Sequence, residues 1–198
     1  FSIATSVRLG DANVNRLLGV TVPDGLLDGS SAFDIVFQAG EGVALNITSN
    51  LDGLAIGLPA PFSKVPEQSE LLNIELKISD AVSIDAAYSN NLSLSIEKDA
   101  ESAWRALALI GEVSREYKLN DVDAGTAVIS GRVEELDISA WADTQTRFSS
   151  GDNLGLPAIV WRDFSVDRLA LGETDFGTFS STGQYEGGLT SLGLVGDF

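Results

Sequence analysis

The sequence contains no cysteine, no histidine and no methionine, and these absences narrow what the chain can do. The lack of cysteine excludes a disulfide framework and thiolate metal sites, and it is compatible with any cellular compartment. The lack of histidine removes the commonest general base and the commonest metal ligand. No apolar run approaches the about 18 residues that a membrane-spanning helix needs.

Positive charge is also scarce. Twelve lysines and arginines face 29 aspartates and glutamates, which gives a formal net charge of −17. Nucleic acids and anionic membrane surfaces bind proteins through clustered lysine and arginine. We therefore expect no nucleic-acid partner, and we interpret the negative charge as a contribution to solubility.

The patterns that carry catalysis are missing as well. The sequence has no G-x-S-x-G motif, no P-loop and no dinucleotide-binding fingerprint. Glu134 and Glu135 are adjacent, so on a strand they point to opposite faces and cannot share one site. Residues 121–125 resemble part of a calcium loop, but Gly125 stands where a third oxygen ligand belongs. The sequence predicts no enzyme, no cofactor and no metal site.

What the chain does contain is a regular alternation of apolar and polar residues over 72–96. Apolar side chains occupy every second position in 72–78, 82–86 and 92–96, and short polar turns separate the three stretches. Successive side chains of a strand point to opposite faces, so this pattern is typical of an antiparallel meander with one apolar face.

The stretch 43–64 begins with the same alternation and ends differently. It turns through 49–53, resumes alternation over 54–58 and stops at Pro59 and Pro61. Proline cannot donate to a strand ladder, so we expect this strand to end at a sheet edge or rim.

The remaining segments complete a mostly β prediction. Short helices are expected at 11–18, capped by Asp11, and at 139–144, capped by Ser139. The predicted fold is mostly β: an antiparallel meander forming a curved, groove-shaped sheet, with one or two short helices. Further strands are expected at 104–110, 126–136, 159–166, 168–171 and 176–181, with a weaker terminal strand in 183–198.

A chain of 198 residues fits one domain, and no shift in composition marks a boundary inside it. The sequence begins at Phe1 and lacks an initiator methionine. We expect residues 1–198 to form a single β-rich domain or a segment of a longer repetitive region. The three tryptophans, Trp104, Trp141 and Trp161, are expected to pack in the core.

Three segments resemble the AsmA-like superfamily, and specifically its YhdP branch of large bacterial envelope proteins. Residues 47–64 resemble the family passage S-D-L-x-G-L-x-x-x-L-P-x-P-L-x-K, with Asn50 in place of Asp and Phe62 in place of Leu. Residues 131–141 are similar to G-x-x-x-x-L-D-L-x-x-W. Residues 163–177 are similar to the paired strands of that family that precede F-G.

The resemblance implies a periplasmic segment of a protein anchored in the inner membrane through a region absent here. Such proteins are thought to carry phospholipid between the inner and outer membranes of Gram-negative bacteria along a β-sheet curled into a gutter. The implied partners are phospholipid acyl chains and neighbouring segments of the same polypeptide, and the implied role is in outer-membrane integrity.

The alternating strands supply candidates for the wall of such a groove, which needs aliphatic side chains free of charge. The same alternation occurs in a β-sandwich, so a scaffolding module with a fully buried apolar face and no lipid carriage remains the alternative. An acidic, ion-dependent adhesion domain is a third hypothesis. The predicted lipid-binding residues are Leu45, Ile47, Ile74, Leu76, Ile78, Val82, Ile84, Leu92, Leu94 and Ile96.

Overall fold

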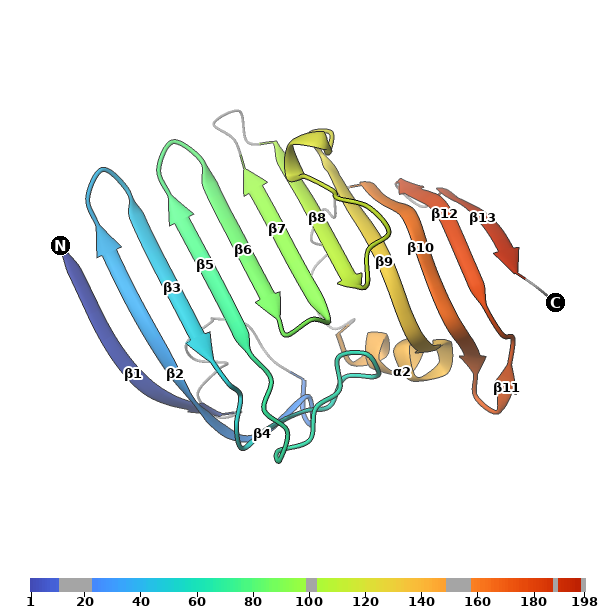
Figure 1. The fold of residues 1–198 in the computed structure, drawn as a ribbon, viewed down its shortest axis with the longest axis horizontal. Helices are drawn as coiled ribbons and strands as arrows, with labels where there is room; N and C mark the ends of the chain where they lie inside the picture. Colours follow the sequence, from blue (N-terminus) through green and yellow to red (C-terminus); the bar gives the residue numbers. More distant parts are fainter. Residues whose placement is uncertain (11–22, 99–102, 149–157, 187–188, 197–198) are drawn as a thin grey trace.

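In the computed structural model the chain forms a curved, single-layer β-sheet (Figure 1). The structure describes residues 1–10, 23–98, 103–148, 158–186 and 189–196. The strands found in these ranges are β1 (Ser2–Gly10), β2 (Leu27–Ala39), β3 (Val43–Ser49), β4 (Leu54–Ile56), β5 (Leu72–Ile78), β6 (Val82–Tyr88), β7 (Leu92–Lys98), β8 (Trp104–Gly111), β9 (Thr126–Asp137), β10 (Ala158–Leu171), β11 (Thr174–Asp175), β12 (Phe179–Glu186) and β13 (Leu189–Gly196).

The strands follow one another across the sheet almost in chain order. The path runs β1-β2-β3-β5-β6-β7-β8-β9-β10-β12-β13, while β4 pairs with β2 and β11 pairs with β10. Strands β1 and β13 lie at opposite ends of the sheet in Figure 1, so the sheet is open and not a closed barrel. The prediction of a mostly β, curved sheet is confirmed.

The meander predicted from alternation is present as β5, β6 and β7. Its antiparallel register places Ile74 opposite Ala86, and Ala86 opposite Leu94. The apolar positions of the three strands therefore lie in rows on one face of the sheet. The Ala-Leu-Ala-Leu segment of β8 extends these rows as a strand, as its regular spacing predicts.

Strand β9 departs from the antiparallel pattern, because it runs parallel to both β8 and β10. Parallel neighbours need a long crossover in place of a hairpin. Residues 112–125 and 138–157 make these two connections. Strand β10 runs without a break through 159–166 and 168–171, which the sequence predicts as two strands, and its register shifts at a bulge between Trp161 and Phe164.

Helix α2 (Ile138–Phe148) follows β9 directly, and its N-cap differs from the predicted one. Asp137 Oδ1 accepts hydrogen bonds from the backbone N–H groups of Ser139, at 2.8 Å, and Ala140, at 3.3 Å. A carboxylate two residues before Ser139 therefore satisfies the free donors of the first turn, and the prediction of Ser139 as cap is wrong. The helix expected at 11–18 lies outside the described residues.

Replacing Asp137 with alanine is expected to destabilise the protein by about 1 kcal/mol, because the first turn of α2 loses its capping acceptor. In a domain of this size that loss lowers the Tm by about 2–4 °C. Thermal unfolding followed by circular dichroism measures the change. Asp80→Ala, in an exposed turn, is the matched control and is expected to shift the Tm by less than about 1 °C. Equal shifts in the two variants would contradict the capping assignment.

The sheet has two buried clusters, one on each face. Leu107 of β8 and Val128 of β9 pack with Val122 beneath the 112–125 connection, which contains the short 3-10 helix η1 (Leu119–Asp121). Figure 1 shows this connection in front of β8 and β9. The second cluster lies at one end of the opposite face and consists of Phe33, Leu51, Leu54 and Tyr88. This cluster extends to Val7 and Leu9 of β1.

Candidate functional site

The ten predicted lipid-binding residues all lie on one face of the sheet, here called the apolar face. Antiparallel register aligns them in rows across β3, β5, β6 and β7. One row contains Leu45, Leu76, Ile84 and Ile96. The next contains Ile47, Ile74 and Leu94, and the remaining three are Ile78, Val82 and Leu92. Alternation alone was enough to place these side chains together.

None of the ten side chains is buried. Ile78 is 43 % exposed, and the other nine are half-buried by their neighbours in the sheet. Within the described ranges, no helix or second sheet packs across the middle of β5, β6 and β7. The centre of the apolar face is therefore an open aliphatic surface in this part of the chain.

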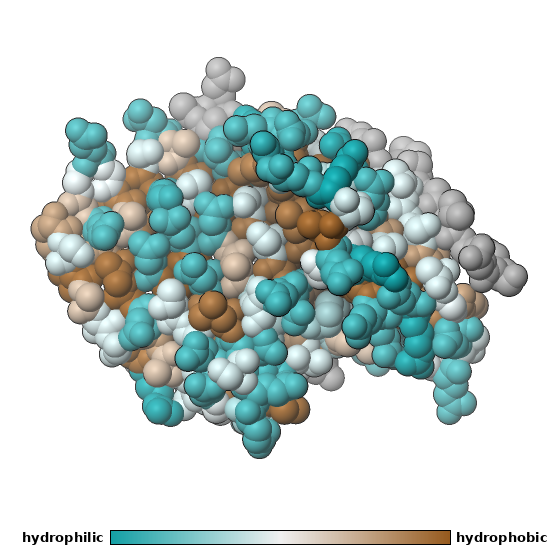
Figure 2. Space-filling view, in the orientation of Figure 1, coloured by the Kyte–Doolittle hydropathy of each residue, from teal (hydrophilic) through white to brown (hydrophobic). Residues whose placement is uncertain are grey.

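The opposite face of the same strands is polar. Lys77 pairs with Glu75 at 2.8 Å, and Ser95 donates to Asp85 Oδ1 at 2.6 Å. The hydrogen bond to Glu75 raises the pKa of Lys77 above its ordinary value. Figure 2 shows hydrophilic side chains spread over this near face, which the 112–125 connection also overlies. The sheet is therefore amphipathic: its polar face suits contact with water, and its apolar face suits contact with apolar groups.

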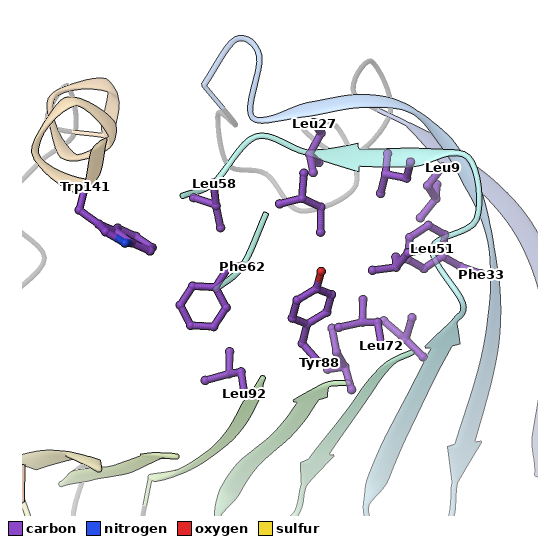
Figure 3. A pocket seen from close by; sticks show the side chains of 14 residues that line it. Leu9, Leu27, Phe33, Leu51, Leu58, Phe62, Leu72, Tyr88, Leu92 and Trp141 are labelled. Carbon is purple, nitrogen blue, oxygen red and sulfur yellow. The ribbon is translucent and has the colours of Figure 1, made fainter. Parts of the chain in front are cut away.

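A cavity of about 520 Å³ lies at one end of the apolar face, and we call it the end pocket (Figure 3). Its lining is almost entirely hydrocarbon. The lining residues are Leu9, Leu27, Phe33, Ile47, Leu51, Leu54, Ile56, Leu58, Phe62, Leu72, Ile74, Tyr88, Leu92 and Trp141. Ile47, Ile74 and Leu92 belong to both the pocket and the predicted set, so the pocket is continuous with the open aliphatic surface.

The covering side of the end pocket is built by residues 54–64, here called the roof. After β3 the chain reverses through Leu51, at φ 55°, and Gly53, at φ 80°, and returns as β4. Leu51 and Leu54 are buried, and β4 pairs with the start of β2, where Ile56 lies opposite Leu27. The prediction that this strand ends at a rim is confirmed, but its folding back over the apolar face has no local signal.

Lys64 locks the two ends of the roof together. Its backbone exchanges hydrogen bonds with Ile56 at 2.9 and 3.1 Å. Its ammonium donates to the carbonyl oxygens of Leu54, at 2.7 Å, and Val65, at 3.1 Å. Only 3 % of the residue is exposed, although a lysine is rarely buried to this extent. No carboxylate of the described residues lies within 4.0 Å of its Nζ, so backbone carbonyls satisfy this buried charge.

Trp141 of α2 closes one side of the end pocket. Its ring meets Phe62 edge-on, with centroids 5.9 Å apart, and its Nε1 donates to the carbonyl of Ala60 at 3.1 Å. The prediction that all three tryptophans are core residues is wrong. Trp141 and Trp161 are half-buried and Trp104 is 40 % exposed, because a single-layer sheet offers little closed interior.

Among the residues that the structure describes, Tyr88 is the one lining residue whose polar group has no partner. The residue is 7 % exposed, and its hydroxyl oxygen makes no hydrogen bond with any of them. Figure 3 shows this oxygen pointing into the ring of aliphatic side chains beneath the roof. Burial is the larger cause, and the charge of Glu70 the smaller, of a pKa raised above the ordinary value for tyrosine.

Most of the pocket was missed by sequence reasoning. The alternation of β5 and β6 does continue to Leu72 and Tyr88, so these two positions carried a usable signal. Leu27, Phe62 and Trp141 reach the pocket from segments far apart in the chain, and local periodicity does not report such contacts.

Among the residues that the structure describes, no group of three or more acidic side chains is placed to hold a metal ion. No helix in the same part of the chain is long and apolar enough to cross a bilayer. Comparison of the chain with protein-family models, curated proteins and solved structures found no match.

Proposed function

We propose that this chain is a periplasmic segment of an AsmA-like protein of the YhdP type. It contributes to phospholipid transport between the inner and outer membranes, and so to outer-membrane integrity, by holding acyl chains on its apolar face. One observation above all supports this function: no described helix or strand covers the middle of the aliphatic surface over β3 and β5–β7, and this surface runs into an apolar pocket.

The physics of such a surface suits a carrier. Each methylene that leaves water for an apolar wall gains about 0.8 kcal/mol without any directional contact. An acyl chain therefore binds anywhere along the rows and moves between neighbouring positions at little cost. The seven-residue strands β3, β5, β6 and β7 span about 23 Å. Half of a bilayer's hydrocarbon core is about 15 Å thick, so one strand accommodates an extended chain.

The two ends of the sheet suit a role within a longer assembly. Strand β1 pairs only with β2, and β13 only with β12, among the described residues. A free strand edge presents unpaired backbone groups that favour pairing with another strand. Neighbouring segments of the same polypeptide are the partners that we propose for these edges, with the membrane anchor in another region of that polypeptide.

Photo-crosslinking side chains at Leu76 and Leu94 are expected to label phospholipid in cells, because both positions lie half-exposed on the apolar face. Mass spectrometry of the purified adducts identifies the lipid. Lys77 and Ser95 are matched controls: each is the next residue of the same strand and lies on the polar face. Labelling at the controls alone would overturn the assignment of the groove.

A scaffolding module with a buried apolar face predicts a different outcome of the same experiment. In that case a protein covers the face, because nothing in the described part of this chain does. Crosslinks from Leu76 and Leu94 to protein, with no lipid adduct, would favour the scaffold over the carrier.

A further inference from the structure

In the described part of the chain, the end pocket holds a single unsatisfied polar atom, the hydroxyl oxygen of Tyr88. We propose that this hydroxyl donates a hydrogen bond to an ester carbonyl oxygen of an acylated glycerol lipid seated in the pocket. The inference rests on the proposed function and names the feature of the lipid that this site recognises.

The unpaired hydroxyl is what makes the site specific. Buried polar groups almost always have a hydrogen-bond partner, and one left without a partner destabilises the protein. The oxygen exposes less than 1 Å², and Tyr88 shares its pocket and buried cluster with Leu54, Ile56 and other aliphatic side chains. An acceptor oxygen of a ligand bound in the pocket would give this hydroxyl the partner that it lacks.

The surroundings select a neutral acceptor. Apart from Tyr88 and the indole of Trp141, the lining residues are all hydrocarbon, so a phosphate or carboxylate here would be a buried, unpaired charge. The negative charge of Glu70 acts on Tyr88 and further disfavours an anion. A tyrosine is already protonated at neutral pH, and the raised pKa of Tyr88 acts in the same direction, so its hydroxyl is a donor.

An ester carbonyl fits both the chemistry and the dimensions. It is uncharged, accepts hydrogen bonds and stands at the head of each acyl chain. From Tyr88, strand β6 runs back past Ile84 to Val82 along the apolar face, a distance of about 20 Å. A chain whose carbonyl lies at Tyr88 therefore rests on aliphatic side chains over its whole length.

Side chains of the roof must move before the lipid oxygen can reach the hydroxyl of Tyr88. Strand β4 is three residues long and joins the main sheet only through three residue pairs with β2, since its other pairing is the single bridge from Ile56 to Lys64 within the roof. Rotation of the Leu54 and Ile56 side chains opens space in the pocket, while the hydrogen bonds from Lys64 to the backbone carbonyls of Leu54 and Val65 keep the roof attached.

Two short-chain lipids test the proposal directly on the full chain. Dihexanoylphosphatidylcholine has two ester carbonyls, and its dihexyl ether analogue has the same headgroup and chain length and no carbonyl. Isothermal titration calorimetry gives both Kd values. We expect the wild-type protein to bind the diester about 5–10-fold more tightly, the worth of one net hydrogen bond, and Tyr88→Phe to bind the two lipids equally.

Tyr117→Phe is the matched control, because the Tyr117 hydroxyl bonds Asp163 at 2.6 Å outside the pocket. It is expected to keep the preference for the diester. Tyr88→Phe is expected to leave the Tm of the lipid-free protein unchanged or raised by about 2–4 °C, since it removes an unsatisfied group. Equal wild-type binding of both lipids, or a preference that survives Tyr88→Phe, would overturn the inference alone. Failure of both lipids to bind the wild-type protein would overturn the proposed function with it.

Discussion

Gly131→Ala is expected to lower the free energy of unfolding by more than about 3 kcal/mol, the largest stability effect that we predict for one methyl group. A Cβ at this position would lie 1.9 Å from the carbonyl oxygen of Ile110, which is backbone of the neighbouring strand β8. Gly131 also has φ +136°, a conformation that side-chain-bearing residues rarely adopt. The parallel β8–β9 pairing must open locally to admit the methyl group. Urea denaturation measures the loss.

Gly125→Ala separates the two causes. Gly125 has φ +78°, but a Cβ there meets no atom within 4 Å. Its substitution is expected to cost about 1 kcal/mol, from backbone strain alone. Losses of equal size in the two variants would show that the close approach of β8 to β9 is not what requires glycine at position 131.

The strands could be predicted because their signal is local. Apolar and polar residues alternate along β5, β6 and β7, and each short polar turn fixes the register of the following strand. The same rule assigned all ten apolar-face residues to one face. The Ala-Leu-Ala-Leu segment of β8 likewise followed from its place in this sequence of strands.

The roof and the parallel strands could not be predicted in this way. Nothing near Ile56 indicates that it pairs with Leu27, because the free energy of that contact comes from burying both side chains in the end pocket. The direction of β9 depends on where the 112–125 connection packs, and Val122 packs there on Leu107 and Val128. Both are outcomes of tertiary packing between distant segments.

The buried polar groups of the end pocket and its roof could not be predicted for a related reason. A tyrosine at the last position of β6 is ordinary in a strand, and only the roof above it turns Tyr88 into a buried donor. Likewise Lys64 has the sequence context of an exposed loop residue, and its burial follows from the carbonyls that the folded roof supplies. The sequence alone thus predicted the residues of the apolar face and did not predict the end pocket.

Leu94→Asp is expected to weaken the binding of a diacyl phospholipid by at least about tenfold. Leu94 lies in the central row of the apolar face, between Ala86 and Ala108 on the adjacent strands. Aspartate removes the aliphatic surface that an acyl chain covers, and its carboxylate must lose water for the chain to bind. Because Leu94 is only half-buried, the charge remains solvated in the lipid-free protein, and the fold is expected to survive. Lipid titration of the purified variant measures the effect.

Ser93→Asp is the matched control, one residue earlier on β7. Ser93 is exposed on the polar face, where it lies opposite Ala87 and Leu109. It adds the same charge to the same strand at almost the same distance from the end pocket, so any effect of net charge alone appears in both variants. Loss of binding in Leu94→Asp with binding retained in Ser93→Asp would locate the lipid on the apolar face. Equal affinities in the two variants would contradict a carrier that uses this face, whatever the end pocket binds.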